Sequence, residues 1–96
     1  RYTLEVEREL VPYAVTVEDR YTNWLAQQAQ AGVTFSEDQR WWLDRIKDTI
    51  IQSAHLDVED LDKAPFTERG GVAGAGAVLG AEAQVLIDDL NESLAA

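Results

Sequence analysis

The chain contains no cysteine, and it has one histidine and two prolines among its 96 residues. The absence of cysteine excludes disulfide frameworks, thiolate metal sites and cysteine nucleophiles. The single histidine, His55, excludes a metal site built on two imidazoles. A lone histidine at a helix end is usually there because its charge is favourable at that position.

Basic residues are also scarce, with 8 Lys and Arg against 18 Asp and Glu, and the net charge is −10. The first, middle and last thirds of the chain are each net acidic, and the basic residues form no run. An acidic surface repels phosphate backbones, whose neutralisation by Lys and Arg supplies most non-specific affinity for nucleic acids. We therefore expect no direct binding to nucleic acid.

Long apolar runs are missing as well, and none approaches the length of a membrane span. We therefore expect a soluble domain that does not bind a membrane. Ninety-six residues with 46% hydrophobic residues suffice for one small core. Because the chain opens on Arg1 without a leader, we expect a piece of a longer polypeptide, with residues 1–11 as the junction and 12–96 as a C-terminal helical domain.

A helical pattern runs from Val17 to about Gly32. One face repeats every three or four residues and consists of Val17, Tyr21, Trp24, Leu25 and Gln28. Upstream, Val6, Leu10 and Tyr13 extend the same helical spacing. Tyr2, Leu4 and Val6 also alternate with polar residues, so a short strand at residues 2–6 is the alternative. Pro12 fits a continuous helix only at a first turn or at a kink.

A second helix is predicted from Ser36 to about Ala54. Ser36 can cap it while Gln39 reaches back to the cap amide. The core face of this helix comprises Trp42, Leu43, Ile46, Ile50 and Ser53. Trp41 and Ile51 lie well away from that face, so each needs a contact of another kind.

Further helical segments follow. Asp57 can cap a short helix that ends at Leu61, and Pro65 interrupts the chain after it. The last helix has one apolar face, made of Ala83, Leu86, Ile87, Leu90 and Leu94. The sequence therefore predicts an all-α fold, a compact bundle of four to five short helices.

The segment RGGVAGAGAVLGAE, residues 69–82, has the glycine spacing of a nucleotide-binding loop. Such a loop works because a buried strand delivers it to the N-terminus of a helix, and the preceding residues DKAPFTER do not form an apolar strand. The structural alternative is a short Ala/Gly helix that packs closely and ends at Gly80. We favour the second interpretation and expect no cofactor site in this segment.

Two acidic patterns resemble catalytic or metal sites. The run DVEDLD, residues 57–62, lacks the oxygen ligand and the glycine that a calcium loop needs at its fifth and sixth positions, so a helix cap is the better account. Asp44 and Asp48 lie one helical turn apart, beside Arg40, Arg45 and Lys47, and we expect them to form surface ion pairs. We therefore expect no catalytic residue and no metal ligand in the chain.

Trp41 has two interpretations. On the predicted helix it lies four residues before Arg45, whose guanidinium could stack on the indole. Either a second helix of this domain covers Trp41, or another protein does. Ile51 lies on the same side of the helix, so Trp41, Arg45 and Ile51 are the candidate partner-binding residues.

Three segments carry a resemblance to a known family: FSEDQRWWLDRIKDTI (35–50), DLDKAPFTERGG (60–71) and LIDDLNESL (86–94). The combination of Trp42, Pro65, Phe66, Arg69, Gly70 and Gly71 is its most specific part. Over residues 10–96 the chain resembles the C-terminal domain of the restriction (R) subunit of type I restriction-modification enzymes, of the EcoEI-like group. In this motif Pro65 can end the preceding helical segment, and Phe66 can pack in the core. Gly70 and Gly71 can form a turn into the next helix, and Arg69 can pair with an acid across that turn.

The resemblance implies a cytoplasmic parent chain with an upstream nuclease domain and an ATP-driven motor that uses ATP and Mg²⁺. It implies that this domain is not itself catalytic and docks the motor onto the modification (methyltransferase) and specificity subunits. An intramolecular brace for the motor domains of its own chain is the alternative. A small enzyme or metal binder is a third class, disfavoured by the missing cysteines and the single histidine.

Overall fold

A computed structural model describes the backbone of residues 2–95 and the side chains of residues 11–95. The helices in chain order are α1 (Tyr2–Gln30), α2 (Glu37–Ser53), η1 (Val58–Asp62), η2 (Phe66–Arg69), α3 (Gly71–Leu79), η3 (Gly80–Glu82) and α4 (Ala83–Ala95), where η marks a short 3-10 helix. No strand occurs among the described residues, and the predicted all-α class is confirmed.

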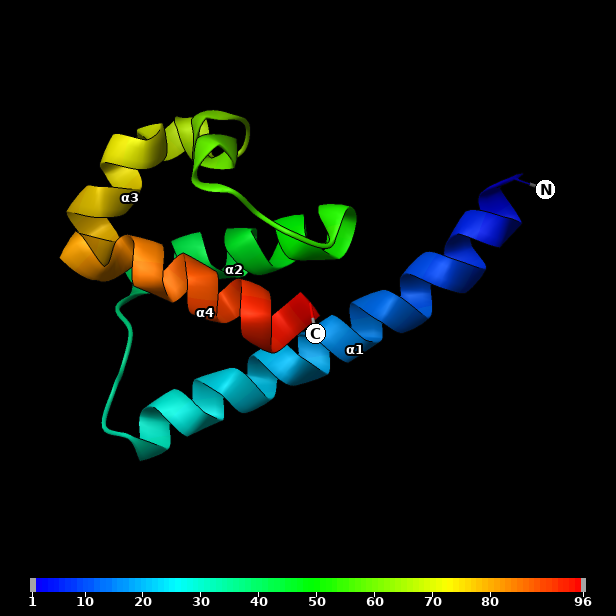
Figure 1. Cartoon of the computed structure of the whole chain (residues 1–96), viewed down its shortest axis with the longest axis horizontal. Helices are drawn as coiled ribbons and strands as arrows, with labels where there is room; N and C mark the ends of the chain where they lie inside the picture. The colour runs from blue at the N-terminus through cyan, green and yellow to red at the C-terminus, as the bar shows by residue number, and fades with distance from the viewer. Residues whose placement is uncertain (1, 96) are drawn as a thin grey trace.

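The first helix differs from its prediction in length. α1 runs unbroken for 29 residues and contains Pro12 in its interior, so the expectation of short helices only is wrong for this element. The alternative of a strand at residues 2–6 is also wrong, because these residues are helical, and the predicted junction at residue 11 coincides with no break in α1. The N-terminal half of α1 extends beyond the other helices (Figure 1).

The predicted capping box of α2 is confirmed. The Gln39 backbone amide donates to the Ser36 hydroxyl (3.1 Å), and the Ser36 amide donates to the side-chain oxygen of Gln39 (2.9 Å). The helix ends at Ala54, which adopts a left-handed conformation with φ 65°. Ser53 is exposed rather than on the core face, and its hydroxyl donates to the carbonyl oxygens of Thr49 and His55 at the end of the helix.

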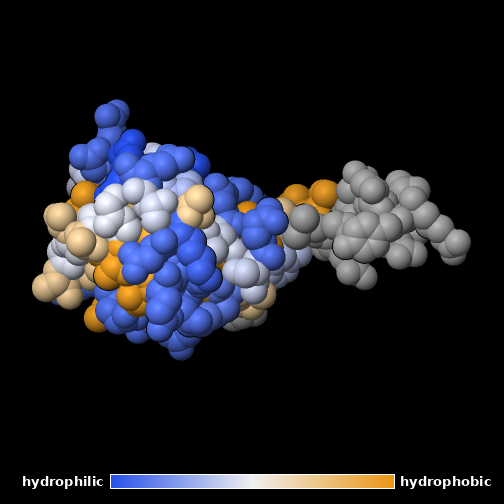
Figure 2. All heavy atoms as spheres, turned by 90° about the horizontal axis from the view of Figure 1, so that it is seen from above, coloured by the Kyte–Doolittle hydropathy of each residue, from blue (hydrophilic) through white to orange (hydrophobic). Residues whose placement is uncertain are grey.

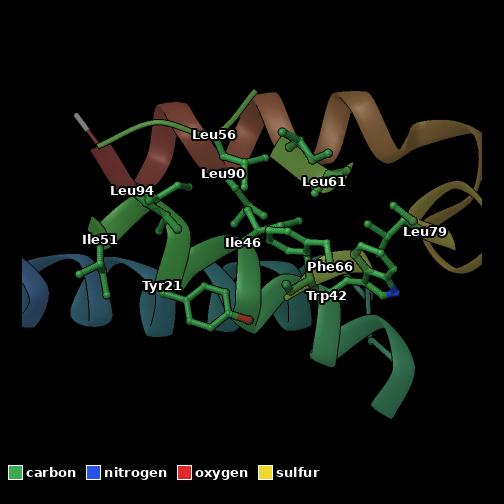
Figure 3. Packing of buried hydrophobic residues seen from close by; sticks show 14 of the residues in the cluster. Tyr21, Trp42, Ile46, Ile51, Leu56, Leu61, Phe66, Leu79, Leu90 and Leu94 are labelled. Carbon is green, nitrogen blue, oxygen red and sulfur yellow. The ribbon is translucent and has the colours of Figure 1, made fainter. Parts of the chain in front are cut away.

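The core forms where α1, α2 and α4 pack against one another, with α3, η1 and η2 covering the remaining side of α2. Its buried members include most of the predicted ones: Val17, Tyr21, Trp24, Trp42, Leu43, Ile46, Ile50, Ile87, Leu90 and Leu94. Figure 3 shows their side chains converging from both sides of α2. Hydrophilic residues cover most of the face seen in Figure 2, and apolar residues gather over the end formed by α3 and the start of α4.

One buried polar side chain connects the chain after α2 to the last helix. Asn91 is 8% exposed and pairs with the backbone of Leu56 in both directions. The Leu56 amide donates to Asn91 Oδ1 (2.9 Å), and Asn91 Nδ2 donates to the Leu56 carbonyl oxygen (2.7 Å). Because Leu56 is itself buried, these two bonds fix the segment between α2 and η1 against α4.

We expect Asn91→Ala to lower the free energy of unfolding by about 2–3 kcal/mol, because it leaves a buried amide and a buried carbonyl of Leu56 without partners. The matched control is Glu92→Ala, at an exposed neighbouring position of the same helix, where we expect a change within about 0.5 kcal/mol. Urea denaturation followed by circular dichroism measures both. Equal effects of the two substitutions would contradict this role of Asn91.

Candidate functional site

Trp41 lies at the edge of the core, on the outer side of α2. It is partly buried, and its ring meets Trp42 edge to face at a centroid distance of 5.3 Å and an interplanar angle of 79°. The guanidinium of Arg45 lies 5.7 Å from the ring centroid, and that of Arg69 lies 4.4 Å from it. The expected stacking of Arg45 on Trp41 is confirmed, and a second guanidinium from a distant segment adds to it.

Trp41 lines an open groove of about 650 Å³ between α2 and the turn that joins η1 to η2. We call this the Trp41 groove. Its lining residues are Trp41, Arg45, Asp48, Thr49, Gln52, Ala64, Pro65 and Glu68. The groove therefore combines an aromatic surface and a proline with charged groups of both signs.

The segment PFTERGG builds the wall opposite α2. Pro65 follows a cis peptide bond and precedes η2, and Phe66 is buried and stacks on Trp42 at a centroid distance of 5.7 Å. Gly70 ends η2 with φ 97°, a conformation that side chains other than glycine rarely adopt. The predicted anchor at Phe66 and the predicted turn at the glycine pair are thus confirmed.

Arg69 pairs with an acid, as expected, but the acid comes from another element. Its guanidinium lies 3.5 Å from the carboxylate of Asp38, in the first turn of α2. Both side chains are largely exposed, so this ion pair contributes little to stability. The same guanidinium lies over the face of Trp41.

The expectation that Ile51 lies outside the core is wrong. Ile51 is 9% exposed and belongs to the buried cluster. Figure 3 shows its side chain pointing toward α1, away from the open side of α2. The long α1 packs along α2 and covers a second side of that helix, which a single predicted core face does not anticipate. Ile51 is therefore no part of the Trp41 groove.

The glycine-rich segment forms α3, and its glycines have structural roles. A Cβ atom at Gly74 would collide with the carbonyl oxygen of Arg69 and would lie 3.2 Å from Cζ2 of Trp42. Gly80 ends α3 with φ 79°, as predicted. The absence of a side chain at Gly74 therefore lets α3 approach η2 and Trp42 closely.

The acidic residues singled out in the sequence have local partners. Asp44 accepts a hydrogen bond from the Tyr21 hydroxyl (2.6 Å) and pairs with Arg40 (3.4 Å). Asp48 pairs with Lys47 (2.8 Å) and Arg45 (3.6 Å). The prediction of ion pairs is confirmed for both carboxylates.

Lys47 and Tyr21 link α1 to α2 electrostatically. Burial opposes the charge of Lys47, but hydrogen bonds to Asp48 and Glu18 outweigh it and raise the pKa of the ammonium group. Burial, assisted by the hydrogen bond to Asp44, raises the pKa of the Tyr21 phenol far above its usual range. The phenol therefore keeps its proton in the folded chain at pH values where a free tyrosine loses it.

The run at residues 57–62 forms η1, as predicted. The Asp57 amide donates to the carboxylate of Asp60 (2.9 Å), and this bond lowers the pKa of Asp60. His55 lies 3.0 Å from Asp57, and both side chains are exposed. Within the described part of the chain, no group of three or more His, Cys, Asp or Glu side chains is placed to hold a metal ion.

The segment Gly71–Ala95 contradicts the expectation that no apolar run approaches the length of a membrane span. By length and composition alone it could cross a membrane, with a mean hydropathy of 1.2 in its most apolar window. Alanine and glycine raise this value without supplying large side chains, and the backbone changes direction at Gly80. The large apolar residues Ile87, Leu90 and Leu94 pack in the core. Packing in the core accounts for these three residues, while 22% of the most apolar window as a whole is buried.

The fold and the Trp41 groove together describe an acidic all-α domain with an open, partly aromatic groove on one side of α2. The chain belongs to the EcoEI R protein C-terminal family, whose model matches residues 1–95, and this family is the C-terminal domain of type I restriction enzyme R subunits. A comparison with curated proteins found no match, and neither did a comparison with solved structures.

The two neighbouring glycines of α3 give a matched test of its packing. We expect Gly74→Ala to lower the free energy of unfolding by about 2 kcal/mol or more, because the added methyl group meets backbone and the Trp42 ring. Gly76 has no atom within 4 Å of its Cβ position, so Gly76→Ala is expected to raise stability by about 0.5–1 kcal/mol through helix propensity. Chemical denaturation distinguishes these signs, and two stabilising substitutions would refute the close approach at Gly74.

The pKa of Tyr21 makes stability depend on alkaline pH. The unfolded phenol ionises near pH 10 while the folded phenol keeps its proton, so the folded state binds more protons and loses stability as pH rises above about 10. Between pH 9 and pH 11 we expect wild type to lose about 1 kcal/mol more than Tyr21→Phe, which lacks the titrating group. Parallel denaturation curves at both pH values check this, and equal losses would show that the phenol is not held protonated.

Proposed function

We propose that this domain docks the R subunit of a type I restriction enzyme onto its methyltransferase–specificity core, through the Trp41 groove. The observation that carries the proposal is the position of Trp41, an indole at the wall of an open groove, stacked by Arg45 and Arg69. Tryptophan and arginine are the residues most often responsible for binding energy at protein interfaces. Membership of the R-subunit family gives the parent assembly in which such a contact would form.

The side chains of the Trp41 groove are already ordered before a partner binds. Trp42 and Arg69 hold the Trp41 ring in place, so little side-chain freedom is lost on binding. Pro65, on the opposite wall, adds a rigid apolar contact. A net charge of −10 favours association with a basic surface and disfavours approach to DNA.

On this proposal the parent chain is a cytoplasmic, ATP-dependent endonuclease that binds ATP and Mg²⁺ upstream of this domain. The domain itself carries out no reaction, contacts no DNA directly and binds no membrane. Its role is to keep the motor and the nuclease attached to the subunits that recognise and methylate the DNA site. The family and the acidic surface support this assignment of attachment to the present domain and of catalysis to the upstream domains.

A second candidate function is an intramolecular brace for the motor domains of the parent chain. One observation favours it: Val11 and Val15 lie one helical turn apart on α1 and are 56% and 55% exposed. Two neighbouring exposed valines on the part of α1 that extends beyond the bundle are suited to contact with upstream domains. The two functions use different surfaces, so variants can separate them.

The test is binding of this chain to the reconstituted methyltransferase–specificity core, measured by calorimetry at two salt concentrations. We expect Trp41→Ala to weaken binding at least about tenfold. Gln52→Lys, an exposed substitution in the groove wall, should also weaken binding because the partner surface is expected to be basic. The control is Gln30→Lys, an equally exposed position at the end of α1, which should bind as wild type does.

Circular dichroism establishes that each variant is folded before binding is measured. Normal binding by Gln52→Lys and Trp41→Ala would refute docking through the Trp41 groove. Loss of binding to the upstream motor domains in Val11→Lys would favour the intramolecular brace. This holds if Val11→Lys binds the methyltransferase–specificity core as wild type does, and also if neither chain binds that core.

A further inference from the structure

A second groove lies between the C-terminal end of α1, the loop that follows it, and the start of α4. We call it the α4 groove. It has a volume of about 260 Å³, and its lining residues are Trp24, Gln28, Val33, Phe35, Glu82, Val85, Leu86 and Asp89. It shares no lining residue with the Trp41 groove.

The floor of the α4 groove is a rigid stack of aromatic rings. Trp24 lies parallel to Phe35 at a centroid distance of 5.7 Å and to Tyr21 at 6.3 Å. The Trp24 Nε1–H donates to the carboxylate of Asp89 in α4 (2.7 Å), which fixes the indole across the helix interface. The floor is therefore formed before any partner binds.

The rim of the α4 groove is apolar and solvent-exposed. Val85 is 66% exposed and Val33 is 42% exposed, which places them among the most exposed large apolar residues of the described chain. The partly buried Phe35 and Leu86 continue the apolar surface toward the floor. Exposed apolar side chains gathered around a hollow, rather than scattered singly, indicate a contact surface.

The charge around the α4 groove has one sign. Glu82 and Asp89 line it, and the Asp89 carboxylate also accepts the hydrogen bond from Trp24. The sequence contains no lysine or arginine between Tyr21 and Gln39, and none from Gly70 to the C-terminus. The lining of the α4 groove thus contains no basic residue, unlike that of the Trp41 groove. Arg20 of α1 lines an adjacent hollow with Trp24 and donates to the carbonyl oxygen of Leu94.

These features select one kind of occupant. A volume below roughly 300 Å³ is small for a small-molecule site but is adequate for a large apolar side chain. A second copy of this chain would bring further negative charge, and a phosphate-bearing ligand would be repelled by the same carboxylates. A protein segment with apolar and basic residues matches both the floor and the rim.

We propose that the α4 groove binds a cationic amphipathic helix of a partner protein. An apolar side chain of that helix packs on Phe35 and Leu86 between Val33 and Val85, and its lysine or arginine side chains pair with Glu82 and Asp89. This contact is separate from docking through the Trp41 groove and does not depend on it.

The test uses a synthetic 18-residue amphipathic helix of leucine and lysine as the probe, with a leucine–glutamate helix of the same pattern as its counterpart. Methyl resonances of Val33 and Val85 in the isotope-labelled chain report occupation of the groove during titration. We expect the lysine peptide to shift these resonances and the glutamate peptide to leave them unchanged. Added salt should weaken the binding because the rim contacts are charged and exposed.

Variants locate the site. We expect Val85→Lys to weaken binding of the lysine peptide about tenfold and Glu82→Lys to weaken it several-fold. The matched control is Val15→Lys, at a similarly exposed valine of α1, which should bind the peptide as wild type does. Both Val85 and Glu82 are exposed, so neither substitution disturbs the core.

Three outcomes would overturn the proposal: no binding of the lysine peptide, equal binding of both peptides, or equal weakening by Val85→Lys and Val15→Lys. Trp41→Ala and Gln52→Lys should leave peptide binding unchanged. Failure of docking through the Trp41 groove is therefore distinguishable from failure of the α4 groove.

Discussion

The stacking of Trp42 on Phe66 joins the two sides of this domain. Trp42 is fully buried, Phe66 is nearly so, and their rings lie 5.7 Å apart with an interplanar angle of 14°. The contact attaches η2 to α2, and the bare Cα of Gly74 allows α3 to close over the same indole. Trp41 precedes this indole on α2 and packs edge to face against it. The buried stack therefore also supports one wall of the Trp41 groove.

The two grooves differ in electrostatic character because of where the basic residues lie. From Arg40 to Arg69 the chain has five basic side chains, and several of them pair with carboxylates on α2 or stack on aromatic rings. The α4 groove is lined by the carboxylates of Glu82 and Asp89 and by no basic residue, and Asp89 also accepts a hydrogen bond from Trp24. One small domain therefore presents a mixed-charge aromatic surface and an acidic apolar surface, which suit partners of different composition.

Local signals were predictable from the sequence. The capping box at Ser36 and Gln39, the glycine end of α3 and the apolar faces of α1, α2 and α4 each depend on residues close together in the chain. The burial of Ile51 was not predictable in this way, because it depends on the direction in which α1 crosses α2. The wall at Pro65 and the approach of Arg69 to Trp41 likewise depend on tertiary contacts. Asn91 was missed although it follows Leu90 on the core face of α4, where a polar residue at apolar spacing was the available signal.

The length of α1 has a structural consequence. Its 29 residues form one continuous helix, and the longest dimension of the molecule, 44 Å, is close to the length of such a rod. The C-terminal part of the rod carries Tyr21 and Trp24, which are bonded to α2 and α4 respectively. The projecting N-terminal end of α1 is therefore continuous with the part held in the aromatic stack, and no loop separates the two.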